Sequence, residues 1–154
     1  MQSFQTSYIL RAPPAILLTV LLLQFYAEAA TWQDFQNRHI APPPGPNENL
    51  NTYCDRMMSA RGMTQPKCKP RNAFIHDAPS IAQKVCRGQS TPKGGNLFDS
   101  ILYFNLTDCQ VTKGKAPPNC GYKGTCHHSR IRVGCTTGKK VSINDPIHFE
   151  AIIP

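Results

Sequence analysis

The cysteines of this chain constrain its fold more than any other feature of the sequence. All seven lie between residues 54 and 135, and none forms the close Cys-x2-Cys pairs that are typical of zinc sites. Dispersed cysteines of this kind indicate a framework of disulfides if the chain reaches an oxidising compartment. Because the number is odd, at least one thiol is free or bonded to another molecule. The seven are Cys54, Cys68, Cys86, Cys109, Cys120, Cys126 and Cys135.

The N-terminal segment predicts such a compartment. Residues 15–23 read AILLTVLLL, an apolar run that follows Arg11 and precedes the small-x-small sequence of residues 27–29. A run this short does not span a bilayer, which needs roughly 20 residues. This order is typical of a secretory signal peptide, with a buried core helix or a retained membrane anchor as alternatives. We therefore expect a signal peptide at residues 1–29 and a single secreted, extracellular domain at residues 30–154.

The chain also carries an excess of positive charge, with a formal net charge of +8 at pH 7. Such an excess favours anionic partners, namely RNA, DNA, heparin-like glycans or anionic membranes. Charge alone does not choose among them.

Local patterns predict helices early in the domain and strands late. The first predicted helix stops before a proline-rich linker, and the second, capped by Asn51 or Thr52, ends at Gly62. Later runs are rich in β-prone residues and are separated by turn-rich pieces. This order favours an α+β fold with an antiparallel sheet. The predicted helices cover residues 32–40, 52–61 and 77–86, and the β-prone runs cover 72–76, 100–106, 130–135 and 147–153.

Three short motifs carry a family resemblance. Residues 68–74 read CKPRNAF, residues 35–39 read FQNRH, and residues 146–149 read PIHF. In this order and among these cysteines, they resemble the CKxxNTF signature, the N-terminal helix and the C-terminal strand of the pancreatic ribonuclease (RNase A) family. The resemblance extends from about Phe35 to Ala151.

The resemblance implies a V-shaped fold of three short helices and a curved antiparallel sheet. It also implies three disulfides, Cys54–Cys109, Cys68–Cys120 and Cys86–Cys135, whose pairing the sequence alone does not select. A fourth family disulfide is missing, as in the angiogenin-like branch and many ribonucleases of non-mammalian vertebrates. Cys126 is then the extra thiol, expected at a hairpin, either free or linking a dimer.

The resemblance assigns catalysis to His39 as general base, His148 as general acid and Lys69 as the cation that stabilises the phosphorane. Histidine suits both proton transfers because its reference pKa of about 6.5 leaves each form accessible near neutrality. The resemblance also implies that no metal or other cofactor is required and that RNA is cut 3′ of pyrimidines through a 2′,3′-cyclic phosphate. DNA lacks the 2′-OH nucleophile and should bind without being cut.

The resemblance places Arg38, Asn72, Ala73, Phe149 and Glu150 at the substrate, and several of these depart from the family pattern. Arg38 replaces a glutamine that contacts phosphate, and Glu150 replaces an aspartate that orients the acid histidine. Ala73 replaces the threonine whose hydroxyl reads the pyrimidine edge, which predicts weaker base selection. Two neighbours also differ, because Arg71 stands at a Val or Ile position and Ile152 at a common Ser position. These departures predict weaker or altered activity.

Other interpretations stay open at this level. A cationic antibacterial protein that binds anionic surfaces, or an angiogenin-like signalling factor, fits the same charge. A ribonuclease inhibitor and a dimer through Cys126 are further expected partners. His127 and His128 beside Cys126 suit either a metal or a solvated turn, and Asn105 begins a glycosylation sequon.

Overall fold

Helix α3 (Trp32–His39), which begins close to the first described residue, ends at a histidine. We analysed a computed structural model, which describes residues 30–154; the predicted signal peptide lies outside the described residues. Helix α3 begins at a capping box in which the Thr31 hydroxyl accepts from the Asp34 N–H and the Asp34 carboxylate accepts from the Thr31 N–H. Phe35 and His39, one turn apart, form its buried face. His39 is therefore the last residue of a helix whose N-terminus is stabilised by a capping box.

Within residues 30–154, helices α4 and α5 also lie where the sequence predicts helices, but with different caps. Helix α4 (Leu50–Ala60) is capped by Asn49, and the chain leaves it through Gly62, whose φ of +73° suits glycine. Helix α5 (Pro79–Cys86) has proline in its first turn and no side-chain cap. The predicted cap Asn51 instead accepts from the backbone N–H of Gly124. Asn51 thus joins α4 to a strand rather than capping it.

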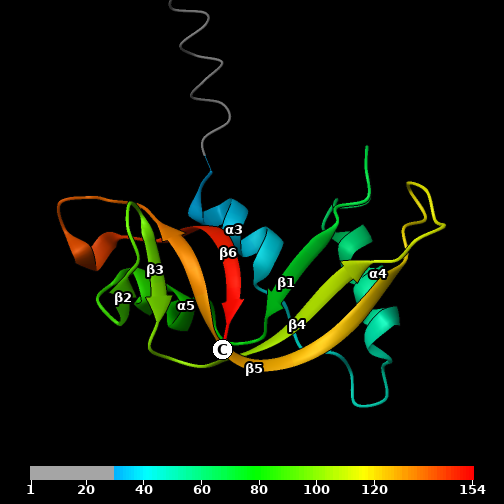
Figure 1. The fold of residues 1–154 in the computed structure, drawn as a ribbon, viewed down its shortest axis with the longest axis horizontal. Helices are drawn as coiled ribbons and strands as arrows, with labels where there is room; N and C mark the ends of the chain where they lie inside the picture. Colours follow the sequence, from blue (N-terminus) through cyan, green and yellow to red (C-terminus); the bar gives the residue numbers. More distant parts are fainter. Residues whose placement is uncertain (1–29) are drawn as a thin grey trace, which may run out of the picture. The chain divides into compact units, whose positions relative to one another are not determined.

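The sheet is antiparallel and is built around one long strand, β5 (Tyr122–Cys135). Strand β1 (Arg71–Ile75) lies at one end of the order β1-β4-β5-β3-β2, and β6 (Pro146–Ile153) pairs with β5 separately. Figure 1 shows β5 curving from the arm that carries α4 to the arm that carries α5. The remaining strands are β2 (Ser90–Pro92), β3 (Leu97–Ser100) and β4 (Phe104–Val111), and a 3-10 turn covers Val141–Ile143.

One strand prediction and the predicted position of Cys126 differ from the structure. The run at residues 100–106 divides between the end of β3 and the start of β4, because Ile101 and Tyr103 are exposed in the loop between them. Cys126, expected at a hairpin, lies in the middle of β5 opposite Thr107 of β4. The β-prone run at 130–135 is only the second half of β5, and sequence reasoning missed its first half because glycine and histidine obscure the strand pattern there.

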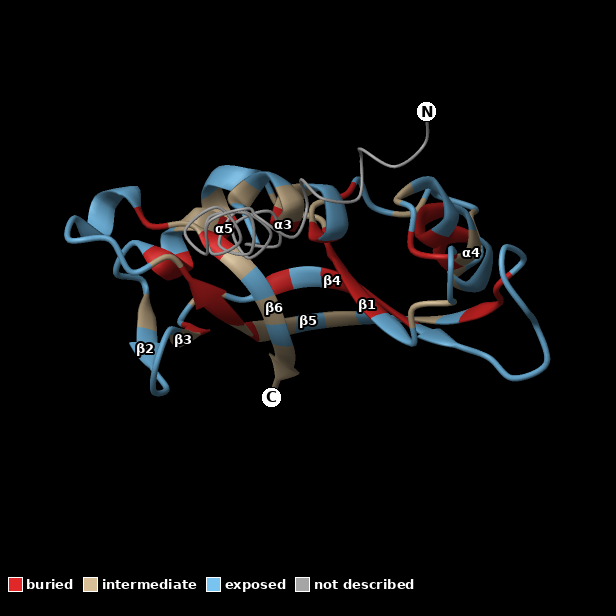
Figure 2. Ribbon diagram, turned by 90° about the horizontal axis from the view of Figure 1, so that it is seen from above, coloured by how far each residue is buried: buried red, intermediate tan, exposed pale blue. Residues whose placement is uncertain are grey.

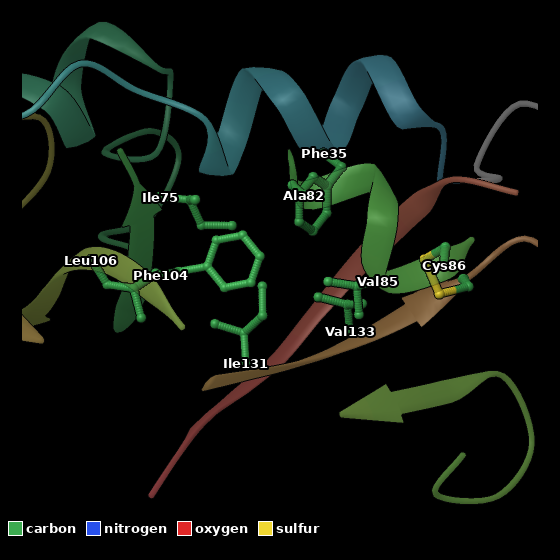
Figure 3. Packing of buried hydrophobic residues seen from close by; sticks show 10 residues of the cluster. Phe35, Ile75, Ala82, Val85, Cys86, Phe104, Leu106, Ile131 and Val133 are labelled. Atoms are coloured by element: carbon green, nitrogen blue, oxygen red, sulfur yellow. A yellow bond between two sulfur atoms is a disulfide. The ribbon is translucent and has the colours of Figure 1, made fainter. Parts of the chain in front are cut away.

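Two hydrophobic clusters and three disulfides stabilise the packing of the helices on the sheet. In the first cluster, Figure 3 shows the Phe104 ring between Ile75 and Ile131, and Val85 beside Val133. The second cluster places the buried face of α4 on the sheet, as the buried residues in Figure 2 show. The disulfides are Cys54–Cys109, Cys68–Cys120 and Cys86–Cys135, which are the pairs that the resemblance implies. Two of them tie α4 to β4 and α5 to β5.

None of the helices in the described part of the chain is both long and apolar enough to cross a membrane.

Candidate active site

A cleft of about 420 Å³ lies between α3, β1 and β6. These three elements lie side by side in Figure 1, because α3 contacts both strands. All eight residues that the sequence predicts at the catalytic centre or the substrate line this cleft. They are Arg38, His39, Lys69, Asn72, Ala73, His148, Phe149 and Glu150.

His39 is buried, and its ring is oriented by one hydrogen bond. The Nδ1–H donates to the carbonyl oxygen of Ala73 at 3.0 Å, so that Nε2 is left as the unprotonated nitrogen of the neutral ring. The rings of Phe35 and Phe149 lie against it, with centroids 4.9 Å and 5.2 Å away. Burial lowers the pKa of His39 from 6.5 to about 3, and repulsion from Lys69, Arg38 and His148 adds to the shift. At neutral pH this imidazole is neutral and able to accept a proton.

Lys69 reaches the cleft from the loop before β1. Its Nζ donates to Asn72 Oδ1 at 2.9 Å, which leaves two of its three N–H groups for a ligand. Burial lowers the pKa of Lys69, with a smaller contribution from Arg38. The Asn72 amide also donates to the carbonyl oxygen of Arg38 at 2.9 Å. Asn72 therefore fixes the lysine relative to the end of α3.

His148 faces the same cleft from β6 and is more exposed than His39. Its Nε2 contacts Glu150 Oε2 at 2.6 Å, which leaves Nδ1 as the nitrogen available to a ligand. The longer glutamate thus makes the contact that the family resemblance expects of aspartate. Gly134 lies opposite His148 in the β5–β6 pairing, and a Cβ there would lie 3.1 Å from His148 Cβ.

The wall beside His39 contains an ion pair that sequence reasoning missed. Arg71 Nε and Nη2 donate to the two carboxylate oxygens of Asp108, each at 2.8 Å. Asp108 is 37 residues away along the chain, and it lies opposite Ala73 in the β1–β4 register. The sequence marked Arg71 only as a departure from the family motif. It gave no sign of the partner Asp108, because the pairing depends on the strand register.

A second hollow adjoins the first and is lined by cations. It shares Arg38 and Lys69 with the main cleft and adds Arg61 and Lys67. Arg61 Nη1 also donates to the carbonyl oxygen of Asn37, close to the end of α3. The cleft therefore continues into a positively charged track suited to a phosphate backbone.

The remaining histidines lie elsewhere. His76 contacts the Ala41 carbonyl oxygen and the Thr107 hydroxyl, which is a structural role between the first linker and β4. His128 contacts Asn105 Oδ1 at 3.0 Å and stacks on Tyr103. Within residues 30–154, no group of three or more His, Cys, Asp or Glu side chains is placed to hold a metal.

Known proteins resemble both the sequence and this fold. The profile of the pancreatic ribonuclease family matches residues 30–150. A pancreatic ribonuclease of Iguana iguana is 43% identical over 122 residues, covering 79% of this chain and 98% of the relative. A ribonuclease of Chelydra serpentina is 35% identical over the same coverage. The crystal structure of green turtle egg white ribonuclease superposes with a TM-score of 0.70 at 35% identity, covering 79% of this chain and 98% of that one. This chain therefore belongs to the pancreatic ribonuclease family.

Proposed function

We propose that His39, His148 and Lys69 form the catalytic centre with which this chain cleaves RNA. As a member of the pancreatic ribonuclease family, the chain is an endoribonuclease. The observation that carries the assignment of residues is the shared cleft, which brings together three side chains from α3, the loop before β1, and β6. Two imidazoles and one ammonium are the groups that a metal-free phosphoryl transfer needs.

His39 acts as the general base. Its Nε2 removes the proton of the ribose 2′-OH while the 2′-oxygen attacks the phosphorus. The Nδ1–H···O contact with Ala73 supports this role because it holds the ring in the tautomer with a free Nε2.

His148 acts as the general acid. Its Nδ1 gives a proton to the 5′-oxygen as the P–O5′ bond breaks, and a 2′,3′-cyclic phosphate remains on the upstream fragment. Glu150 orients the ring through Nε2. Lys69 donates to the phosphorane oxygens, where negative charge accumulates in the transition state.

The substrate lies along the cleft with its scissile phosphate between the two histidines. The upstream base, a pyrimidine, fits the wall of Ala73 and Phe149, and the phosphate backbone follows the cations of Arg38, Arg61 and Lys67. Raised salt should weaken RNA binding because these cations release counterions from the strand.

Single substitutions test the catalytic assignment. We expect His39→Ala and His148→Ala each to lower kcat by about 10²–10⁴-fold on single-stranded RNA. His128→Ala is the matched control, because this exposed histidine lies outside the cleft. A catalytic-site variant that kept wild-type turnover would remove that histidine from the mechanism.

The product and substrate chemistry give a second test. Chromatography should find a 2′,3′-cyclic phosphate, and an oligomer with 2′-deoxyribose at the cut site should bind but resist cleavage. Cleavage of that oligomer would contradict attack by the 2′-oxygen.

Secretion completes the proposal, since pancreatic ribonucleases are secreted and the predicted signal peptide fits that route. Partners other than RNA stay predictions. These are anionic bacterial or cell surfaces, a ribonuclease inhibitor, and a second copy of the chain through the exposed thiol of Cys126.

A further inference from the structure

Arg71 lines the cleft beside Ala73, where the proposed function places the upstream base. Arg71 and Ala73 are two residues apart in β1 and share one face of the strand. Arg71 is held by Asp108 through two hydrogen bonds of 2.8 Å, and both residues of the pair border the position of Ala73. The Arg71 side chain is 57% exposed, whereas that of Asp108 is 4% exposed. The guanidinium therefore covers the carboxylate and is the charged group of this pair that a ligand meets.

The ion pair leaves hydrogen-bond donors free and occupies the acceptors. Arginine has five N–H groups, and Asp108 receives two of them, so three remain for a ligand. Asp108 Oδ2 also accepts from Gln110 Nε2 at 3.3 Å. The carboxylate thus has three donors and little capacity to accept from a base.

The backbone of Ala73 adds another donor at the same place. Pro70 and His76, which flank β1, bond to β4 through their backbones, so by the alternation of an antiparallel pair the N–H and C=O of Ala73 point away from β4. Its carbonyl oxygen is already bonded to His39 Nδ1. The Ala73 N–H points along the same free edge of the strand, and its side chain has no hydroxyl that could accept. The free polar groups that Arg71 and Ala73 present here are consequently N–H groups.

Cytosine and uracil differ in how they meet these N–H groups. Both present an acceptor at O2, but cytosine presents a second acceptor at N3, where uracil carries an N–H. With O2 on the Ala73 N–H and position 3 facing Arg71, these donors satisfy both acceptors of cytosine. In the same pose a donor is set against the N3–H of uracil, which then loses its partner on leaving water.

We infer that Arg71 is the specificity-determining residue of this enzyme and that it makes cleavage prefer cytidine over uridine on the 5′ side of the cut. This inference rests on the proposed function, because it places the base beside the proposed catalytic centre. One good hydrogen-bonding pair discriminates between bases by about fivefold or more. We therefore expect a cytidine-to-uridine ratio of kcat/KM of at least about five.

The ratio is measured on two oligodeoxynucleotides, each with one ribonucleotide, either cytidine or uridine. Arg71→Met removes the donors and should bring the ratio close to one, mainly through loss of cytidine cleavage. Arg71→Lys keeps the charge without the planar fork and should also lose most of the preference. The matched control is Arg56→Met, because Arg56 makes the same two-point contact with Glu48, at 2.9 Å for each bond, and is 53% exposed.

Several outcomes would overturn the inference. These are a wild type that cuts after uridine as readily as after cytidine, an Arg71→Met variant that keeps the ratio, or one that lowers both rates equally. Full retention of the preference in Arg71→Lys would also contradict it, since charge alone would then suffice. Thermal unfolding of each variant shows whether the fold is intact.

A binding measurement separates this inference from the proposed function. Calorimetry with cytidine 3′-monophosphate and uridine 3′-monophosphate measures the affinity for each base without catalysis. The wild type should bind the cytidine compound more tightly, and Arg71→Met should remove the difference. That result together with no cleavage of either oligomer would support the role of Arg71 in base recognition and reject the catalytic assignment. Equal affinities in the wild type would reject the role of Arg71.

Discussion

At the scale of single residues, the environment of His39 changes the proton affinity of its ring. Burial against Phe35 and Phe149, with nearby cations, lowers its pKa from 6.5 to about 3. In the free enzyme the base is thus unprotonated over most of the acidic range. The acid limb of kcat/KM should therefore lie well below pH 6.5.

A bound phosphodiester should raise the His39 pKa again, because its negative charge favours the imidazolium. The acid limb of kcat, which reports the enzyme–substrate complex, should consequently lie at higher pH than the limb of kcat/KM. Initial rates across pH at low and saturating RNA measure both limbs. Coincident limbs at pH 6.5 would contradict the buried neutral base.

Asn72 connects two catalytic elements without touching the reacting atoms in the proposed mechanism. It accepts from Lys69 and donates to the Arg38 carbonyl oxygen. Asn72→Ala should lower kcat, by up to about 10²-fold if the ammonium is misplaced, with a smaller change in KM. Asn72→Asp keeps the acceptor for Lys69 and should recover part of kcat. Equal losses in both variants would point to a purely structural role.

At the scale of elements, the β5–β6 pairing positions His148. A Cβ on Gly134 would lie 3.1 Å from His148 Cβ and 3.2 Å from Asn96 Nδ2, so these neighbours must shift by a few tenths of an ångström. Gly134→Ala should lower kcat more than it lowers the free energy of unfolding. Gly45→Ala is the control, because its nearest neighbour would be 3.7 Å away. Unchanged kcat in Gly134→Ala would show that His148 accommodates the methyl group.

The contact between α4 and β5 depends on another glycine. A Cβ on Gly124 would lie 2.6 Å from the Leu50 carbonyl oxygen, a backbone atom at the start of α4. Gly124→Ala should therefore destabilise the fold by about 1–3 kcal/mol. Urea unfolding monitored by circular dichroism measures the loss, again with Gly45→Ala for comparison. A stability equal to that of the wild type would contradict the close approach of α4.

At the scale of the whole molecule, His39 couples stability to pH. Between the unfolded pKa near 6.5 and the folded value of about 3, the unfolded chain binds one proton more than the folded chain. Stability should therefore fall as pH falls through this range, at about 1.4 kcal/mol per pH unit from this residue. His39→Gln, which does not titrate, should flatten the dependence. Urea unfolding at pH 6.5, 5.5 and 4.5 measures it, and parallel curves would reject the depressed pKa.

Local sequence was enough to locate much of the fold. The first helix was predicted at residues 32–40, before the prolines that stop it, and Gly62 ends α4 as expected. The dispersed cysteines indicated a disulfide framework, and the family resemblance supplied its pairing. These features are readable because helix-stopping residues, turns and short motifs depend on neighbouring residues.

Long-range contacts were decided by the tertiary structure alone. The strand pattern did not place Cys126 in the middle of β5, because the strand is specified there by pairing with β4 rather than by β-prone residues. Nor did it show that Arg71 meets Asp108 or that His39 bonds to Ala73. The sequence determined which groups the enzyme has. The register of the sheet decided which of them meet, because it sets distances between residues that are far apart along the chain.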